Sequence, residues 1–155
     1  MTLAPNVKPV ATATPSEAME VLRGQGLRIT TPRRLIVESL FSADGPLTAA
    51  ALTAELTMDE SSVYRNLELL EQHGLVRHLH LGHSPGLYVL AARDSEYLYC
   101  EHCHAVQMVA PAELEEIREL VRQRFGYTPR FTHWALVGLC DNCRSSEHAA
   151  PHVSV

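Results

Sequence analysis

The stretch Asp59-Glu-Ser-Ser-Val-Tyr-Arg-Asn-Leu-Glu-Leu-Leu-Glu-Gln-His-Gly74 carries the clearest helical pattern in the sequence. Its apolar residues recur at i, i+4 and i+7, a spacing that places them on one face of a helix. These residues are Val63, Leu67 and Leu70. Aspartate is preferred at helix N-caps and glycine just after a helix ends. We therefore expect one helix between Asp59 and Gly74, with its apolar stripe turned into a core.

The opposite face of this helix is polar and carries Ser62, Tyr64 and Arg65. A helix that reads double-stranded DNA needs polar groups and an arginine in its N-terminal half, where they reach bases and phosphates in the major groove. A solvated helix face gives the same pattern, so the pattern alone leaves both interpretations open. Upstream, Arg28 and Arg33 are candidates for additional phosphate contacts, and ordinary surface charge is the alternative.

The segments on either side of this helix have the order of a winged helix-turn-helix. Three shorter helical patterns precede the helix. Two extended apolar segments follow it, separated by the turn signal His83-Ser-Pro-Gly86. We expect helices at 16–25, 32–42 and 48–56, and strands at 75–81 and 87–92. Several short helices followed by a hairpin predict a DNA-binding winged helix in the first half of the chain.

The four cysteines form two Cys-x2-Cys pairs, Cys100 with Cys103 and Cys140 with Cys143. Each pair directs two sulfurs at one ion, and four thiolates complete a closed tetrahedral zinc site of the structural type. Two redox dithiols or disulfides are the alternative. A redox pair normally opens a helix, whereas these pairs lie at the ends of expected strands, and a reducing compartment keeps thiols free. We therefore predict one structural Zn²⁺ ion in the second half of the chain.

The second half otherwise reads as a small α/β domain. We expect strands at 97–99, 105–109 and 131–139, and an amphipathic helix at 113–125. The helix is expected to turn four apolar side chains inward: Leu114, Ile117, Val121 and Phe125. The predicted fold class is thus α+β, in five parts. They are a flexible arm at 1–15, a winged helix at 16–92, a hinge at 93–96, a dimerisation domain with a four-cysteine zinc site at 97–144 and a polar tail at 145–155.

Charge and hydropathy limit the possible partners. The formal net charge is −5, but residues 1–93 hold eight basic and nine acidic side chains, so the acidic excess lies mostly in the second half. A nearly neutral first half can bind DNA if its arginines gather on one face. No apolar run approaches the roughly 20 residues that span a bilayer. The first 15 residues lack the apolar core of a signal peptide. We expect a cytoplasmic protein with no membrane partner.

Two further sets of residues are candidate metal ligands. His78 and His80 alternate on an expected strand, so both rings lie on one face, although a His-x-His pair is more often a surface or core pair than a metal site. The second set contains carboxylates and one histidine, a mixture that suits a divalent first-row metal. Its members are Asp94, Glu96, Glu115 and His133. A solvated acidic linker is the alternative for the carboxylates.

The motifs occur in an order that resembles the ferric uptake regulator family of bacterial repressors. The resemblance covers roughly residues 16–144. It rests on Arg28-Ile-Thr-Thr-Pro-Arg33, Ser62-Val-Tyr-Arg-Asn-Leu67, Gly74-Leu-Val-Arg77, the strand around Tyr88 and both cysteine pairs. It implies a homodimer whose winged helices bind a palindromic operator when a regulatory metal occupies the hinge. It also implies that Tyr64 and Arg65 contact DNA and that the four cysteines bind zinc.

The sequence departs from the family pattern at the hinge. Family members commonly carry a histidine-rich run before the first cysteine pair, but residues 93–99 hold no histidine. Ser95 and Tyr97 stand where two regulatory histidines are usual, and Val89 and Met108 stand where acidic ligands are usual. The common iron- or peroxide-sensing site is therefore expected to be absent. A second family site is retained in altered form, since Asp94, Glu96, Glu115 and His133 fall on its positions.

Another resemblance singles out the histidines. His78-Leu-His-Leu-Gly-His83 and the strand from His133 to Cys140 are similar to the nickel-responsive branch of the family, in which two hairpin histidines and one on the last strand share a metal. The regulatory ion is left open between Ni²⁺, Fe²⁺, Mn²⁺ and Zn²⁺.

Other functions also stay open. One alternative is a regulator of this family that senses redox state or haem, and another is a zinc-ribbon interaction module. An enzyme is disfavoured because four cysteines leave no open position on zinc.

Overall fold

The computed structural model describes residues 7–93 and 95–147, the last two by their backbone alone. These residues divide into two compact units. The first contains residues 7–79 and 85–93, and the second contains residues 80–84 and 95–147. The tip of the expected hairpin, residues 80–84, thus belongs to the second unit, whereas the sequence suggested a single boundary at residues 93–96.

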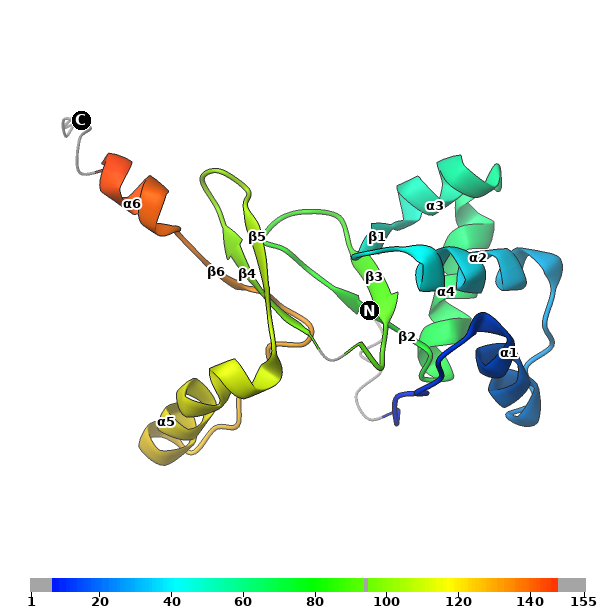
Figure 1. The fold of residues 1–155 in the computed structure, drawn as a ribbon, viewed down its shortest axis with the longest axis horizontal. Coiled ribbons are helices and arrows are strands. Elements are labelled where there is room, and N and C mark those ends of the chain that lie inside the picture. Colours follow the sequence, from blue (N-terminus) through cyan, green and yellow to red (C-terminus); the bar gives the residue numbers. More distant parts are fainter. Residues whose placement is uncertain (1–6, 94, 148–155) are drawn as a thin grey trace. The chain divides into compact units, whose positions relative to one another are not determined.

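The first unit is a winged helix. Its four helices are α1 (Pro15–Gly24), α2 (Thr31–Ser42), α3 (Ala49–Leu56) and α4 (Glu60–Gln72). Each begins at a side-chain oxygen that accepts a backbone N–H of the first turn, an arrangement that stabilises helix N-termini. The capping residues are Thr14, Thr30, Thr48 and Asp59. Within this unit α2 and α3 pack against α4, and α1 packs against α2 (Figure 1).

Three antiparallel strands complete the unit in the order β1-β3-β2. They are β1 (Leu47–Thr48), β2 (Val76–Leu79) and β3 (Leu87–Leu90). The sequence predicted the hairpin of β2 and β3 but not the short strand β1. The predicted stripe of α4 is confirmed, because Val63, Leu67 and Leu70 have no exposed surface and belong to a single core. That core fixes the buried face of α4, so its outer face is presented in one orientation.

Residues 7–13 pack against the winged helix, whereas the sequence suggested a flexible arm over residues 1–15. Val10 contacts the core, and its backbone N–H donates to the carbonyl of Gly74 at 2.9 Å. Gly74 has a φ of 80°, and a Cβ there would lie 2.5 Å from the carbonyl oxygen of Lys8. The glycine that ends α4 therefore also allows the arm to pass close by.

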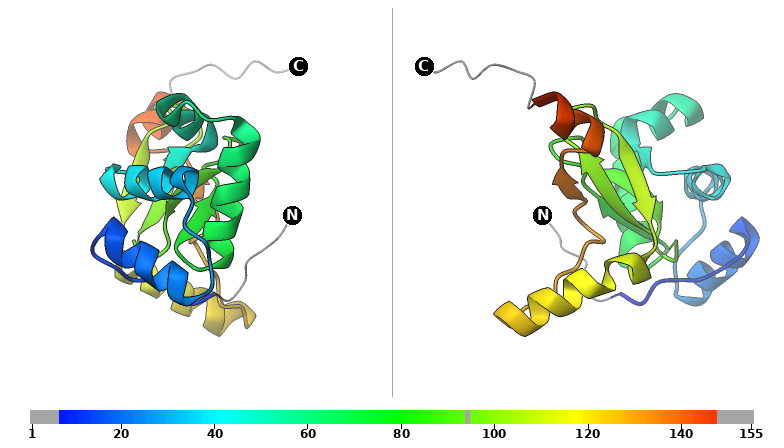
Figure 2. Two further views of the ribbon diagram at one scale, coloured as in Figure 1. Left: turned by 90° about the vertical axis from the view of Figure 1, so that its right-hand side faces the viewer. Right: turned by 60° about the vertical axis from the view of Figure 1, so that its left-hand side comes forward.

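The second unit is a three-stranded sheet with helices at its two ends (Figure 2). Strand β4 (Glu96–Cys100) is central, paired antiparallel with β5 (Val106–Val109) and parallel with β6 (Leu136–Gly138). A 3-10 turn, η1 (Pro111–Leu114), leads into α5 (Glu115–Phe125), and α6 (Asp141–Glu147) follows β6. A separate bridge pairs His80 with Trp134. The α+β class predicted from the sequence is confirmed.

Two expectations for the second unit are wrong. The last strand covers residues 136–138 rather than 131–139. The amphipathic helix buries less than its pattern suggests, because no residue of α5 is buried and Phe125 is 65% exposed. Of the four side chains expected to face inward, only Leu114, at the end of η1, is buried. The pattern identified an apolar face correctly, but one copy of the chain does not cover that face.

Among the described residues, no helix has the length and apolar character needed to cross a membrane.

Candidate metal centres and nucleic-acid interface

The four cysteines come together at one end of the sheet in the second unit. Cys100 ends β4, Cys103 lies in the turn that follows, Cys140 directly precedes α6, and Cys143 lies within α6. The parallel pairing of β4 with β6 places the two pairs side by side. All four sulfurs lie within 4.8 Å of one another. The sheet therefore assembles the ligand set that the spacing predicted.

The spacing of the sulfurs fits a tetrahedral zinc ion. The Sγ atoms of Cys103 and Cys140 are 3.8 Å apart. A tetrahedron with Zn–S bonds of about 2.3 Å has S–S edges of about 3.8 Å. All four cysteines are free, and none is in a disulfide. The donor set and its geometry thus match a structural zinc site rather than two disulfides.

The electrostatics of the cluster also favour a cation. Backbone N–H groups of Cys103 and Cys140 point at the Cys100 sulfur and lower the pKa of that thiol to about 6. The N–H of Cys140 lies 3.4 Å from this sulfur. Hydrogen bonds with the neighbouring thiols raise the pKa of Cys143 to about 12, and the bond with Cys140 has the largest effect. One thiolate forms readily and opposes ionisation of the others, so a bound cation is needed to hold all four as thiolates.

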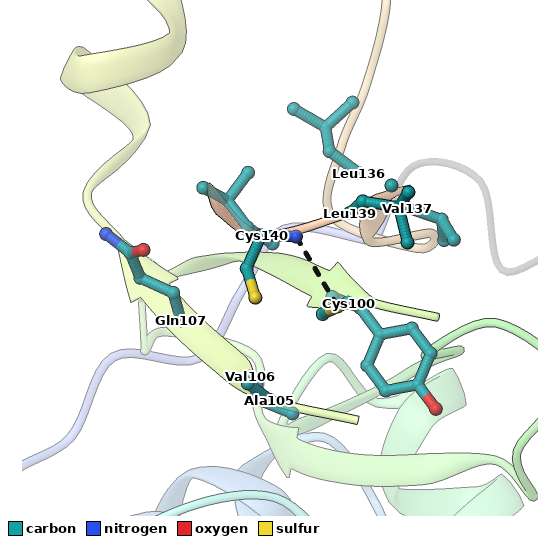
Figure 3. Close-up of a pocket in the computed structure, with 11 residues that line it drawn as sticks. Cys100, Ala105, Val106, Gln107, Leu136, Val137, Leu139 and Cys140 are labelled. Carbon is teal, nitrogen blue, oxygen red and sulfur yellow. Dashed lines mark hydrogen bonds between the residues drawn. The ribbon is translucent and has the colours of Figure 1, made fainter. Parts of the chain in front are cut away.

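A cavity of about 450 Å³ opens beside the cluster (Figure 3). The side chains that line it come from β4, β5, β6 and the residues next to these strands, and they are mostly apolar. They include Leu98, Val106, Leu136, Val137 and Leu139. In Figure 3 the backbone nitrogen of Cys140 points at the Cys100 sulfur along one wall. This end of the unit therefore combines the cluster with uncovered apolar surface.

A second group of possible ligands in the same unit contains His80 and His133. The His80 N–H donates to the carbonyl of His133 at 2.8 Å, and the Ala135 N–H donates to the carbonyl of His80 at 3.0 Å. The two rings lie edge to face, with centroids 5.3 Å apart, and offer nitrogens within 4.8 Å of each other. Trp134 stacks on His80 with its ring centroid at 4.8 Å. The bridge between two distant segments thus brings these histidines together.

His78 lies on β2 in the winged helix, two residues before His80. Its ring contacts Glu71, near the end of α4, with Nδ1 2.5 Å from the carboxylate oxygen Oε1. This hydrogen bond raises the pKa of His78, and burial opposes the rise. The Tyr88 ring lies nearby and is tilted against it, with a centroid distance of 6.3 Å. His78 is therefore held by its own unit in a defined orientation.

The carboxylates that the sequence suggested as an oxygen-rich metal site are hydrogen-bonded to an arginine, Arg118. Glu96 is only 2% exposed, and both of its oxygens accept hydrogen bonds from the guanidinium of Arg118. Arg118 also donates to Glu115 at 3.1 Å and to the carbonyl of Pro111 at 2.8 Å. Glu96 raises the pKa of Arg118, which keeps the guanidinium charged. Asp94, the remaining carboxylate of this set, lies outside the described residues.

The outer face of α4 presents Tyr64 and Arg65 to solvent, with Tyr64 45% exposed. Ser62 is half-buried next to the Asp59 cap, whose carboxylate accepts its backbone N–H at 2.8 Å. Asn66 turns inward and donates to the carbonyl of Ser62 at 2.8 Å. The helix therefore offers an aromatic hydroxyl and a guanidinium side by side near its N-terminus, as a groove-binding helix requires.

The two upstream arginines have different environments. Arg28 is exposed, whereas Arg33 is only 8% exposed and its guanidinium donates to the backbone carbonyl of Arg28. Burial lowers the pKa of Arg33. Arg33 therefore fixes the loop that carries Arg28, and it does not present its own charge at the surface. Of the two candidate phosphate contacts, the structure places only Arg28 where phosphate can reach it.

Residues 24–133 match the ferric uptake regulator family, which is well over half of the chain. The chain belongs to this family. It is thus a transcriptional regulator of a DNA-binding, metal-binding family, and its relatives are regulators rather than enzymes.

Individual relatives agree with this assignment. The peroxide operon regulator of Bacillus subtilis is 27% identical over 137 residues, which cover 85% of this chain and 94% of that protein.

Two solved structures of ferric uptake regulators are similar. The Helicobacter pylori protein, described with three functional metal-binding sites, has a TM-score of 0.67 at 22% identity, over 84% of this chain and 94% of that one. The Pseudomonas aeruginosa protein, solved with manganese, has a TM-score of 0.63 at 26% identity, over 80% of this chain and 98% of that one.

Three residues of this ferric uptake regulator family member matter to the candidate sites but were missed in the sequence. They are Glu71, Arg118 and Trp134. Arg118 stands three residues after Glu115, a spacing that predicts an ion pair on a helix surface. Trp134 directly follows His133. Glu71 gives no local signal, because its contact with His78 depends on how the end of α4 packs against β2.

Proposed function

We propose that this chain is a metal-responsive transcriptional repressor that binds a palindromic double-stranded DNA operator as a homodimer in the cytoplasm. One observation carries the proposal. The chain combines an exposed polar face on α4 with two sets of possible metal ligands, four thiols and three imidazoles. Four thiolates suit a permanent structural ion. A set of imidazoles suits a second ion such as Ni²⁺ or Zn²⁺. A regulator that reports metal supply can use the first set to stabilise its fold and the second to bind the sensed ion.

DNA contact is assigned to the N-terminal half of α4 and to the loop before α2. Tyr64, Arg65 and Ser62 lie at the start of α4, and Arg28 lies exposed in the loop. A helix that enters the major groove contacts bases with its N-terminal residues, while neighbouring arginines contact phosphates. Arg33 supports this surface through its hydrogen bond to the backbone of Arg28. The excess acidic charge lies mostly beyond residue 93, outside the winged helix.

A second copy of the chain is the proposed cover for the apolar surface of the second unit. Several large apolar side chains of its sheet and of α5 are at least 47% exposed, and surface of this kind marks interaction sites. They are Val106, Met108, Leu120, Phe125 and Val137. A two-fold dimer would present two copies of α4, and this matches an operator with two half-sites.

The regulatory ion is assigned to His78, His80 and His133, whose ring nitrogens are possible ligands. The oxygen-rich set is a weaker candidate, because the Arg118 guanidinium already neutralises Glu96 and contacts Glu115. Imidazole ligands favour Ni²⁺ or Zn²⁺, whereas carboxylates suit Mn²⁺. We therefore propose Ni²⁺ or Zn²⁺ as the sensed ion, ahead of Fe²⁺ and Mn²⁺.

The ion is proposed to act by shifting a population. His78 belongs to one unit, and His80 and His133 belong to the other. An ion held by all three favours conformations in which the two units keep one relation. If that form fits both half-sites of the operator, metal binding raises DNA affinity, and DNA raises metal affinity by the same factor.

Redox sensing is the second candidate, favoured by the similarity to a peroxide operon regulator. The absence of histidines between residues 93 and 99 weighs against a peroxide site like the common one of the family.

DNA binding by α4 is tested with an operator selected from random-sequence duplexes by the protein loaded with Zn²⁺ and Ni²⁺. The Arg65→Ala variant is expected to bind this operator about 10- to 100-fold more weakly at fixed salt, since a bidentate base contact contributes about 1–3 kcal/mol. Arg23→Ala, an exposed arginine of α1, is the control and should bind as the wild type does. Equal binding by both variants would remove α4 from the interface.

A further inference from the structure

We propose that Glu71 is the positioning residue for His78, so that the helix assigned to DNA contact is hydrogen-bonded directly to a ligand of the regulatory ion. This inference rests on the proposed function in one respect, the role of His78 as a ligand. It adds a residue outside both ligand sets and a physical link within the winged helix. Every contact that carries it lies inside the first unit.

Glu71 contacts two groups of His78 through one carboxylate oxygen. One oxygen of Glu71, Oε1, accepts the backbone N–H of His78 at 3.2 Å and lies 2.5 Å from Nδ1 of the same residue. Both side chains are largely buried, with 17% of Glu71 and 21% of His78 exposed. A single carboxylate thus holds both the strand backbone and the ring. This arrangement fixes the imidazole more tightly than a surface ion pair between long side chains would.

The hydrogen bond decides which nitrogen can bind a metal. An ionised carboxylate only accepts hydrogen bonds, so Nδ1 must carry the proton that lies between the two atoms. In the neutral ring the lone pair is then on Nε2. Histidines that bind metals almost always donate their other N–H to a carboxylate, a carbonyl or water, which fixes the tautomer and makes the ligand more basic. Glu71 therefore prepares Nε2 of His78 as the ligand atom before any ion arrives.

Glu71 also connects the ligand to the DNA-binding surface. It lies on α4, the helix that carries Tyr64 and Arg65, and the buried stripe of this helix is fully packed. A force on the His78 ring is transmitted to the last turn of α4 through the Glu71 carboxylate. Removing the carboxylate should therefore weaken metal binding and also reduce the gain in DNA affinity that the metal produces.

The test titrates Ni²⁺ into the full chain with its cysteine cluster loaded with zinc. Glu71→Ala is expected to lower the Ni²⁺ affinity at least about 10-fold, the usual effect of losing an outer-shell partner. Glu71→Gln should lose less, because its amide oxygen can still accept the Nδ1 proton. Glu68→Gln, an exposed position on the same helix, is the matched control and should bind as the wild type does.

A second readout does not depend on the metal. In the Ni²⁺-free protein above the pKa of His78, ¹⁵N NMR should show the proton of His78 on Nδ1 in the wild type and a loss of this preference in Glu71→Ala. A purely structural ion pair would lower the stability of Glu71→Ala but leave its Ni²⁺ affinity unchanged. If Glu71→Ala fails to fold, the Glu71→Gln affinity and the wild-type tautomer decide the question.

The two proposals fail in different ways. If His78→Ala lowers Ni²⁺ affinity but neither Glu71 variant does, the role of Glu71 is overturned and the histidine site stands. If His78→Ala itself binds Ni²⁺ as the wild type does, His78 is not a ligand, and both the proposed site and the role of Glu71 are overturned.

Discussion

Loss of zinc from the cysteine cluster is expected to unfold the second unit while the winged helix stays folded. The cluster joins the end of β4 to the start of α6, across a sheet of only three short strands. Structural zinc contributes about 10–16 kcal/mol of apparent binding free energy in zinc-finger peptides, which is as large as the whole stability of an ordinary domain. The first unit has its own core of buried apolar side chains and needs no ion.

Hydrogen exchange measures this difference segment by segment. In Cys140→Ser, or after zinc is chelated, amides of β4, β6 and α6 should lose protection, whereas those of α4 keep it. Ser145→Ala is a matched control, because it alters the same short helix α6 but leaves every sulfur in place. Retained protection in β4 and β6 without zinc would show that the cluster has no structural role.

Replacing Arg118 by methionine is expected to destabilise the second unit by about 3–5 kcal/mol. The substitution leaves the Glu96 carboxylate, which is 2% exposed, without the guanidinium that both of its oxygens contact. Removing one partner of a buried ion pair carries a cost of this size, because the remaining charge is desolvated and unpaired. Arg118 also lies over the Phe131 ring, with its guanidinium carbon 5.3 Å from the centroid, and this contact is lost too.

Urea unfolding of matched variants isolates this effect. Arg122→Met removes an arginine of the same helix whose side chain is 48% exposed, and its ion pairs with Glu115 and Glu119 are worth at most about 1 kcal/mol. Adding Glu96→Gln to Arg118→Met should recover part of the stability, since no buried charge then remains. Equal losses in Arg118→Met and Arg122→Met would mean that Glu96 is not dependent on Arg118.

The parts of the fold that follow from short sequence distances were predictable. The stripe and the cap of α4 lie within four turns of one helix, and the sequence identified both. The paired cysteines were equally clear, because a Cys-x2-Cys turn fixes two sulfurs whatever the rest of the chain does. The two cysteine pairs lie far apart in the sequence of this domain. A tetrahedral zinc site needs four ligands, so the sequence also predicted that the two pairs bind one ion.

The parts that depend on packing between distant segments were not predictable. Arg28 and Arg33 look equivalent in the sequence, yet only the fold shows that Arg33 turns back to a backbone carbonyl. The apolar stripe of α5 does not indicate whether this face packs against the same chain or against a second copy. The same limit applied to Glu96, whose carboxylate suggests a metal until Arg118 is found against it.

Metal content measured together with operator binding tests the central claim most directly. Elemental analysis of the purified protein before and after mild chelation, with DNA binding at fixed salt in both states, should reveal two classes of ion. We predict one retained zinc per chain and a second, removable ion that restores tight DNA binding when Ni²⁺ or Zn²⁺ is returned, but not in His80→Ala. If zinc alone is found and DNA binding ignores added metals, the chain is not a metal sensor.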